Sequence, residues 1–504
     1  SQFLSPLHNR RTDEYGGSVE NRTRLVRELI EETKEAIGDT CAVAVRMAVN
    51  DGAGTSEQPV SEDRREMFEI MAELPDLWDI NVHNYEREMS LSRFFKEGIL
   101  EESIHYVKSI TSKPVVSVGR FTSPDTMVSL IRKGTLDFVG AARPSIADPF
   151  LPRKIEEGRP EDIRECIGCN ICYSGDSLGV PIRCTQNPSM GEEWRRGWHP
   201  EKIQTKGSDA TVLVIGAGPA GLEATRALGQ RGYKVMLAEA ATALGGRITQ
   251  ECRLPGLAEW GRGRDYRVNQ IQTMPNVDIF PDNNLNAEDA LSIGAEHIVV
   301  ATGSKWRADG FGRYHSEACL DLGPGDQLFT PNDIFKGRLP QGKVLIFDDD
   351  HYYLGGVLAE ALAKQGVEVC FVTPENLVSA WGVMIDEQYQ AQQRLLHLGV
   401  QIITAHGLDH FDGANAHLGC VYTERTQVVA ADAILLVTAR TPSDHLYHEL
   451  AVQIDSDFPG SAPSLTKIGD CDAPAIIAAA IYAGHRYARE LEADVKESDV
   501  RWSE

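Results

Sequence analysis

Short apolar segments alternate with amphipathic segments along the first third of the chain. Residues 21–37 place apolar side chains at helical spacing, which predicts a helix with Leu25, Leu29 and Ile30 facing inward. Residues 41–49 are rich in valine and alanine and predict a strand. The alternation continues with predicted helices at 61–73, 99–111 and 124–133 and predicted strands at 76–82, 114–120 and 137–144. Short apolar strands of this kind are buried on both faces, so we expect a parallel sheet wrapped by helices.

Residues 1–160 contain four such strands, whereas a closed (β/α)8 barrel needs eight. We interpret this region as the C-terminal half of a (β/α)8 barrel. The first half is expected to lie upstream of this sequence or to come from another chain. A half-barrel alone would expose two parallel strand edges. A small open α/β domain is the alternative interpretation.

Candidate ligand groups lie at the predicted strand ends, because functional residues of β/α barrels lie where strands end and loops begin. The residues at these ends are Arg46, His83 to Glu88, Gly119–Arg120 and Ala142–Arg143. An arginine beside a small residue suits a phosphate, because guanidinium binds phosphate with two hydrogen bonds and the small residue lets the backbone approach. Ordinary surface arginines are the alternative.

A dinucleotide-binding pattern begins at residue 211. The apolar strand TVLVI runs into GAGPAG and a helix, and a second strand, KVMLAEA, ends near Glu239. The fingerprint glycines are Gly216, Gly218 and Gly221, with Gly246 after the second strand. Such glycines let the turn approach a pyrophosphate at the helix N-terminus, and the acidic residue accepts hydrogen bonds from a ribose. We predict an ADP or FAD site here, since both ligands present the same pyrophosphate and ribose.

A second strand of this kind, KVLIF at 343–347, is followed by DDDHYYLGG instead of a glycine-rich turn. Three aspartates stand where the phosphates of a dinucleotide would lie, and like charge opposes binding there. We predict a domain that keeps the nucleotide-binding fold but does not bind NAD(P)H.

These patterns define an α/β chain with four parts. The half-barrel (1–160) is followed by a cysteine-rich loop and linker (161–205). A Rossmann domain of the flavoprotein disulfide-reductase type takes residues 206–335 and 430–504. The degenerate NAD(P)-like domain lies between them at 336–429.

Cysteines gather in one stretch, CIGCNICYSGDSLGVPIRC at 166–184. Cys166, Cys169 and Cys172 follow one another at a spacing of three, and Cys184 comes twelve residues later. Structural zinc sites usually use two separated cysteine pairs, whereas this triplet is typical of ferredoxin-like 4Fe–4S sites. We predict a 4Fe–4S cluster, with zinc as the alternative. Because such clusters pass single electrons, we expect a flavin that takes two electrons from a substrate and releases them singly.

The formal net charge of −24 argues against nucleic acid or an acidic membrane surface as a partner, since both need a basic face. No apolar run is long enough for a transmembrane helix, and the first residues lack the pattern of a signal peptide. Ten cysteines in 504 residues are too dilute for a disulfide scaffold, so we expect a reduced, cytoplasmic protein.

Several stretches together resemble one family. SPLHNRRTDEYGGSVENR (5–22) is similar to the signature of the old yellow enzyme barrel family. The likeness is narrowed to the trimethylamine, dimethylamine and histamine dehydrogenases by ARPSIADPFLP (142–152), CIGCNIC, GEEWRRGWHPEK (191–202) and VIGAGPAG. The resemblance covers essentially the whole chain. More distantly, the chain resembles 2,4-dienoyl-CoA reductase, which shares this layout.

The resemblance implies FMN in the barrel, a 4Fe–4S cluster and ADP in the GxGxxG domain. It also implies oxidation of a small amine to an imine, a separate electron-transfer flavoprotein as acceptor, and a homodimer. By motif position, Arg46 should lie near the FMN ring, and Arg120 and Arg143 near its phosphate. The implied cluster ligands are Cys166, Cys169, Cys172 and Cys184, and the implied ADP-binding residues are Gly216, Gly218, Gly221 and Glu239.

Departures from the family pattern concern the substrate site. The family's catalytic Tyr–His pair and the cysteine that attaches FMN lie upstream of this sequence. An aromatic residue of the family's substrate bowl aligns with Tyr85, and the acid that supports the histidine corresponds to Glu88. A bowl tryptophan is replaced by Asp176, which suits a second amine or an imidazole on the substrate; a solvated loop acid is the alternative. Arg262 stands where the family has a surface tyrosine implicated in partner docking.

An amine dehydrogenase is thus the main hypothesis. The second is an NADPH-dependent 2,4-dienoyl-CoA or enoate reductase, which predicts reduction of the flavin by NADPH; the DDDHYY stretch argues against it. The third is an electron-transfer subunit without a catalytic site of its own, suggested by the half-barrel.

Overall fold

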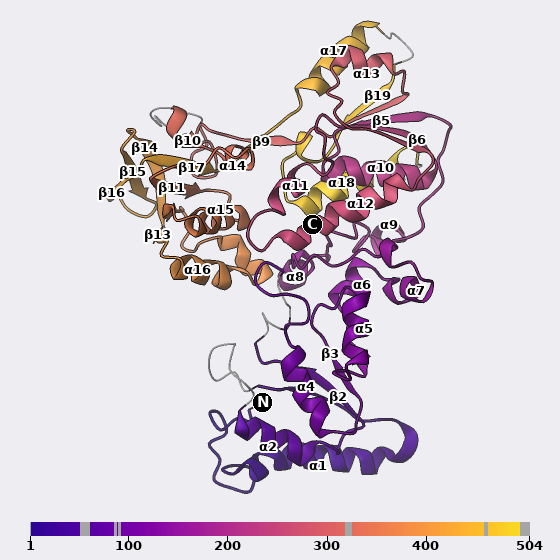
Figure 1. Cartoon of the computed structure of the whole chain (residues 1–504), viewed down its shortest axis with the longest axis vertical. Coiled ribbons are helices and arrows are strands. Elements are labelled where there is room, and N and C mark those ends of the chain that lie inside the picture. The colour runs from indigo at the N-terminus through magenta and orange to yellow at the C-terminus, as the bar shows by residue number, and fades with distance from the viewer. Residues whose placement is uncertain are drawn as a thin grey trace. The chain divides into compact units, whose positions relative to one another are not determined.

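The computed structural model divides the chain into two compact units, Ser1–Pro160 and Glu161–Glu504 (Figure 1). The residues that it describes are 2–50, 61–84, 88, 92–317, 325–457 and 462–493. Both units alternate strands with helices, which confirms the predicted α/β class.

The first unit is built on one sheet of parallel strands in sequential order. Its strands are β1 (Ala44–Ala48), β2 (Leu77–Asn81), β3 (Val115–Ser117) and β4 (Phe138–Val139). Its helices are α1 (Val19–Ile37), α2 (Glu62–Met71), α4 (Glu101–Ile110), α5 (Pro124–Arg132), α6 (Arg143–Ala147) and α7 (Leu151–Glu156). Sequential parallel strands joined by helices are the arrangement of a β/α-barrel segment. The last strand ends earlier than predicted because Pro144 favours the first turn of a helix, and α6 begins there.

The core of the first unit lies between its sheet and helices. Trp78 on β2 is fully buried, and its indole N–H donates to the carbonyl of Ala72 at 2.9 Å. On α1, Thr23 and Ile30 lie on the buried face, two helical turns apart. The prediction that Leu29 faces inward is wrong, since 56% of this residue is exposed. Leu29 lies on the flank of the buried face, which apolar spacing alone does not separate from its centre.

The second unit contains two parallel sheets. The first has the strand order β19-β8-β5-β6-β7. Its strands are β5 (Thr211–Ile215), β6 (Lys234–Ala238), β7 (Val277–Phe280), β8 (His297–Val300) and β19 (Ser464–Lys467). Helix α10 (Pro219–Arg231) follows β5 and packs against α12 (Arg262–Gln272) and α18 (Ile477–Glu490). Figure 1 shows these three helices side by side.

The second sheet has the order β10-β17-β11-β12-β13. Its strands are β10 (Leu328–Phe329), β11 (Lys343–Asp348), β12 (Glu368–Val372), β13 (Gln401–Ile403) and β17 (Ala433–Val437). Strands β10 and β17 thus lie outside the span 336–429 predicted for this domain. Strand β17 pairs with β11, and β10 pairs with β17; these are long-range contacts that the apolar pattern of the sequence does not encode.

Smaller elements complete the second unit. Its other helices are α8 (Ile171–Leu178), α9 (Glu193–Arg196), α11 (Arg247–Glu251), α13 (Ala287–Ser292), α14 (Pro331–Phe335), α15 (Tyr353–Lys364), α16 (Gln388–His397) and α17 (His445–Asp457). A three-stranded antiparallel sheet comprises β14 (His406–Phe411), β15 (Asn415–Cys420) and β16 (Thr426–Ala430). Strands β9 (Ser304–Trp306) and β18 (Arg440–Pro442) form an antiparallel ribbon, each directly after a strand of a different parallel sheet.

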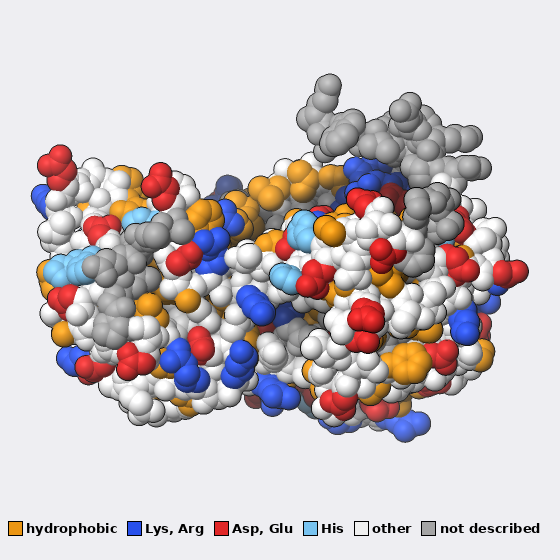
Figure 2. Space-filling view, turned by 90° about the horizontal axis from the view of Figure 1, so that it is seen from above, with side chains coloured by type: hydrophobic (Ala, Val, Ile, Leu, Met, Phe, Trp, Pro, Cys, Tyr) orange, Lys and Arg blue, Asp and Glu red, His pale blue; other side chains and the backbone are white. Residues whose placement is uncertain are grey.

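Basic and acidic side chains are interspersed on the surface seen in Figure 2. Among the described residues on that face, no continuous basic surface is visible. Among the helices in the described ranges, none combines the length and the apolar character needed to cross a membrane.

The contribution of a buried ion pair to the stability of the first unit can be tested by mutation. Lys154 on α7 bonds to Asp148 at 2.6 Å, and both side chains are almost fully buried. Lys154→Met keeps the apolar stem but removes the cation from a buried carboxylate, a change that costs about 3–5 kcal/mol. We expect this variant to unfold at a clearly lower urea concentration, measured by circular dichroism.

The matched control is Arg153→Met on the same helix. Arg153 pairs with Glu157 at 2.8 Å, but both side chains are largely exposed to solvent. Exposed pairs contribute little, so the urea midpoint should stay near that of the parent protein. Equal shifts in the two variants would contradict a stabilising role for the buried pair.

Candidate functional site

A cavity of about 460 Å³ lies at the carboxyl ends of the first parallel sheet in the second unit. The predicted nucleotide residues on its wall are Gly216, Gly218, Glu239 and Gly246. Asp470 also lines it, together with four residues that the sequence did not single out: Arg247, Ser304, Trp306 and Arg440. The cavity wall therefore combines residues predicted to bind a nucleotide with side chains for which the sequence predicted no such role.

Of the fingerprint glycines, Gly221 is needed for packing within the protein, and Gly218 leaves space in the cavity. A Cβ at Gly221 would lie 1.8 Å from the carbonyl oxygen of Gly216, so glycine is needed there for helix α10 to pack against the turn. A Cβ at Gly218 would meet no protein atom within 4 Å. Since Gly218 lines the cavity, the missing side chain leaves room for a ligand and not for the protein's own packing.

The polar groups at this end of the cavity suit a nucleotide. Helix α10 begins after Gly218 without a side-chain cap, so its first backbone N–H groups are available to an anion. Glu239 accepts hydrogen bonds from the backbone N–H groups of Ala217 at 2.6 Å and Ala241 at 2.8 Å. These bonds hold the carboxylate after β6, where a ribose is bound in folds of this type. The residues present fit a pyrophosphate and a ribose.

Asp470 anchors another part of the cavity wall. One carboxylate oxygen accepts from Arg247 at 3.2 Å, from Ser304 at 3.2 Å and from Arg440. The other oxygen accepts from the backbone N–H of Ala475 at 3.0 Å. Both oxygens of Asp470 are therefore already used by the protein.

The corresponding place in the second sheet is filled by the chain itself. Asp349 accepts from the backbone N–H groups of Tyr314, at 2.9 Å, and Arg313. It also lies 3.2 Å from Nε2 of His351. Burial raises the pKa of the neighbouring Asp348 to about 8. The loop and the acidic groups stand where phosphates would bind, which argues against NAD(P)H at this sheet.

The four cysteines predicted to bind a cluster lie together. Cys166 and Cys169 precede helix α8, Cys172 lies within it, and Cys184 follows it. Burial raises the pKa of Cys184, and the other three cysteines nearby raise it further. The structure thus brings Cys184 into electrostatic contact with the triplet, although twelve residues separate it from Cys172.

Backbone donors point at the sulfur atoms, as expected of a cluster site. The N–H of Gly168 donates to Cys166 at 3.4 Å, and the N–H of Asn187 donates to Cys184. The hydroxyl of Thr185 lies 3.2 Å from the sulfur of Cys169. Hydrogen bonds to the sulfurs are among the features that set the potential of an iron–sulfur cluster. The donor set therefore fits a cluster bound through four thiolates.

In the part of the chain that the structure describes, no group of three or more His, Cys, Asp and Glu side chains is placed to hold a metal ion.

A residue of helix α12 contacts the start of the cysteine segment. Arg262, the position expected at a docking surface, lies 3.0 Å from the carboxylate of Glu165. Its guanidinium also donates to the carbonyl of Cys166 at 3.4 Å. Arg262 is thus partly buried against the cysteine loop, and its side chain has a structural contact that the sequence did not reveal.

In the first unit, two of the predicted site residues are in contact with each other. Arg46 on β1 forms an ion pair with Glu88 and lies 3.5 Å from Asp79. Asn81 donates to the other oxygen of Glu88 at 3.4 Å. Glu88 is therefore a neighbour of the arginine expected near the FMN ring. Tyr85 lies outside the described residues.

The two phosphate candidates follow neighbouring strands. Gly119 and Arg120 come after β3, and Arg120 is buried with a positive φ of 53°. Ala142 precedes helix α6 and Arg143 begins it, just after β4. Because β3 and β4 are parallel neighbours, their carboxyl ends share one edge of the sheet. Two arginines at one edge fit the phosphate of a flavin nucleotide.

Asp176, the third predicted substrate residue, is exposed on helix α8. Its backbone carbonyl accepts from the N–H of Gly179 near the end of the helix. Its carboxylate is therefore available to solvent or to a ligand.

Models of two known protein families match two regions of the chain. The model of the NADH:flavin oxidoreductase / NADH oxidase family matches residues 1–162. The model of pyridine nucleotide-disulphide oxidoreductases matches residues 210–318. The chain is 38% identical to dimethylamine dehydrogenase from Hyphomicrobium sp. (strain x) over 523 residues, covering 97% of this chain and 70% of that protein.

Two solved structures are similar over nearly the whole chain. Histamine dehydrogenase from Rhizobium sp. 4-9 is 50% identical with a TM-score of 0.93, covering 98% of this chain and 72% of that one. The 6-hydroxypseudooxynicotine amine oxidase from Pseudomonas geniculata N1 is 46% identical with a TM-score of 0.92, covering 97% and 73%. Both likenesses extend through the cysteine segment and the nucleotide cavity.

Gly218→Val tests the nucleotide cavity. The new side chain meets open space and not protein, so we expect a folded chain that has lost most of its bound adenine nucleotide. The measurement is the nucleotide released per chain after heat denaturation, separated by chromatography. Gly221→Ala is the contrasting variant, because its Cβ would overlap the carbonyl of Gly216 and should destabilise the fold itself. Unchanged nucleotide content in Gly218→Val would contradict this placement of the ligand.

Proposed function

The chain belongs to the flavin-dependent amine dehydrogenase family, and we propose that it oxidises a small histamine-like or methylated amine to an imine, which water converts to an aldehyde. It is an oxidoreductase that acts on CH–NH donors. The observation that carries this proposal is 50% identity to a histamine dehydrogenase structure over 98% of the chain. The cysteine segment and the nucleotide cavity, described above, lie inside that span.

The cofactors proposed are FMN, a 4Fe–4S cluster and ADP. When bound, FMN supplies a two-electron acceptor and the cluster a one-electron carrier. Arg120 and Arg143 would bind the FMN phosphate at the shared edge of β3 and β4. The cluster ligands would be Cys166, Cys169, Cys172 and Cys184.

The ion pair of Arg46 and Glu88 has a consequence for the substrate. An amine gives up hydride from its neutral form, and a nearby carboxylate favours the protonated form. Because Glu88 is bonded to Arg46, its negative charge is largely balanced within the protein. Glu88 would therefore orient Arg46 beside the flavin without holding the reacting nitrogen in its charged form.

The cavity supports ADP rather than FAD as the nucleotide. An FAD would extend beyond the pyrophosphate and would need polar partners for its ribityl hydroxyl groups. Asp470, which lines the cavity, already accepts hydrogen bonds from Arg247, Arg440, Ser304 and the backbone N–H of Ala475. A ligand that ends at the pyrophosphate does not compete with these bonds.

The proposed electron acceptor is an external electron-transfer flavoprotein. Its support is the filled nucleotide position in the second sheet, where Asp349 binds the backbone of Arg313 and Tyr314. Without NAD(P)H at that sheet, the electrons would pass to another protein. A homodimer and a cytoplasmic location, suggested by the family and by the dilute cysteines, complete the proposal.

The direct test is anaerobic mixing of the purified holoprotein with histamine, trimethylamine and dimethylamine in turn. We expect one of these amines to bleach the flavin absorbance, because the amine donates its electrons to FMN. NADPH is the control and should leave the spectrum unchanged. Bleaching by NADPH but by none of the amines would replace this proposal with a reductase.

Asp176→Ala tests the choice of substrate class. If Asp176 binds the distal charged group of a bifunctional amine, its loss removes a charged hydrogen bond and should raise KM by about 10-fold. The KM of a simple alkylamine should change little. Asp209→Ala, which removes another exposed carboxylate, is the control. A similar rise in KM for both kinds of amine would contradict the assignment.

A further inference from the structure

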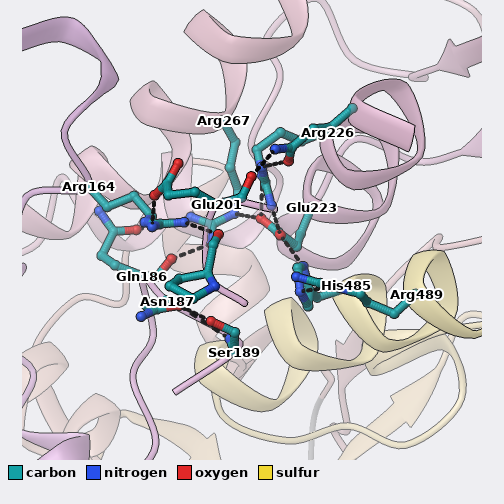
Figure 3. Close-up of polar contacts among 12 residues, drawn as sticks. Arg164, Gln186, Asn187, Ser189, Glu201, Glu223, Arg226, Arg267, His485 and Arg489 are labelled. Carbon is teal, nitrogen blue, oxygen red and sulfur yellow. Dashed lines mark hydrogen bonds and ion pairs between the residues drawn. The ribbon is translucent and has the colours of Figure 1, made fainter. Parts of the chain in front are cut away.

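A buried carboxylate on helix α10 organises the polar core around the cysteine segment (Figure 3). Glu223 has no exposed surface. It accepts from Arg226 at 2.6 Å, from Nε of Arg267 at 2.8 Å and from Nδ1 of His485 at 2.8 Å. Burial acts to raise the pKa of Glu223, but the two guanidinium groups outweigh it and hold the pKa well below its usual range. Glu223 is therefore a stable anion.

His485 is neutral in this cluster. Burial lowers its pKa to about 4, against the opposing effect of Glu223. Its Nδ1–H donates to Glu223, and its Nε2 accepts from Arg489 at 3.1 Å. One carboxylate thus faces two buried guanidinium groups, those of Arg226 and Arg267, so this part of the core carries an excess of positive charge.

The two arginines use their remaining donors differently. Arg226 donates to the side chain of Gln230 on its own helix at 2.9 Å. Arg267 instead reaches the segment after Cys184, donating to the side-chain oxygen of Gln186 at 3.0 Å and to its backbone carbonyl at 3.2 Å. Figure 3 shows Arg267 directed toward Gln186 and Asn187. Only Arg267 of this pair contacts the cysteine-bearing segment in the described contacts.

Gln186 connects the two ends of that segment. Its amide nitrogen donates to the carbonyl of Glu165 at 2.9 Å, next to Cys166. On its other side, Asn187 donates its N–H to Cys184. Gln186 and Arg267 are almost completely buried. A single side chain therefore ties the residue before the first cysteine to the residues after the last one.

We propose that Arg267 and Gln186 are positioning residues for the iron–sulfur cluster, holding Cys184 in place relative to the cysteine triplet. The proposal rests on the proposed cluster. The forked guanidinium is needed because it binds Glu223 and both oxygens of Gln186 at once, which a lysine ammonium does not reproduce.

Arg267→Lys tests the proposal while preserving charge. The purified full-length holoprotein is treated with a ferrous-iron chelator, and the loss of the cluster absorbance is followed. Loss of a residue that orients metal ligands typically weakens metal binding about 10–100-fold, so we expect iron to leave at least about 10-fold faster than from the parent protein. The electron paramagnetic resonance signal of the dithionite-reduced cluster should also change shape.

Arg226→Lys is the matched control, since it alters the other guanidinium on the same carboxylate without touching Gln186. It should lose iron at the rate of the parent protein and keep the parent signal. Gln186→Met, which changes no charge, should behave like Arg267→Lys. Equal iron loss from the two lysine variants, or a parent-like Gln186→Met, would overturn the proposal.

The result of this experiment can be distinguished from the result of the test of the proposed function. If the purified protein contains no iron–sulfur cluster, this proposal falls together with the cluster assignment. If the cluster is present and equally stable in all variants, this proposal alone is wrong. Reduction of the flavin by an amine is read from a different chromophore and is unaffected by either result.

Discussion

Glu223 lies in the middle of helix α10, out of contact with solvent. A carboxylate loses its hydration on burial, so the folded state tolerates it only where cations and hydrogen-bond donors replace the water. Arg226 comes from the same helix, Arg267 from α12 and His485 from α18. Three helices must therefore meet at one point, and removing any one of these partners would leave the carboxylate poorly compensated.

The surrounding sites depend on that meeting point. Helix α10 begins at the cavity proposed to bind a nucleotide, so the residues that fix α10 also fix the backbone donors at its N-terminus. Arg267 extends from the same point to Gln186 and so to the cysteine segment. Arg262, at the start of the same helix α12, contacts the carbonyl of Cys166. One helix thus supports both ends of the proposed cluster site.

The two parallel sheets of the second unit show how one fold serves two purposes. Where β5 ends, Gly218 leaves open space beside an uncapped helix. Where β11 ends, Asp349 accepts two backbone hydrogen bonds from a neighbouring loop. The first arrangement presents donors to an anion, and the second presents a carboxylate that accepts two backbone N–H groups of the protein itself. The strands are similar, and the two sheets differ in the residues at their carboxyl ends.

The sequence by itself determined the alternation of strands and helices in the first unit, the glycine fingerprint with Glu239, the acidic replacement after β11 and the four clustered cysteines. These features depend on local spacing and on residue type, which can be read directly along the chain. Only the tertiary structure decided that β10 and β17 join β11, that Leu29 faces solvent, and that Glu88 pairs with Arg46. It also decided that Arg267 donates a hydrogen bond to Gln186, 81 residues away in sequence. Such pairings leave no periodic trace, because a buried polar side chain takes its partner from whichever element packs against it.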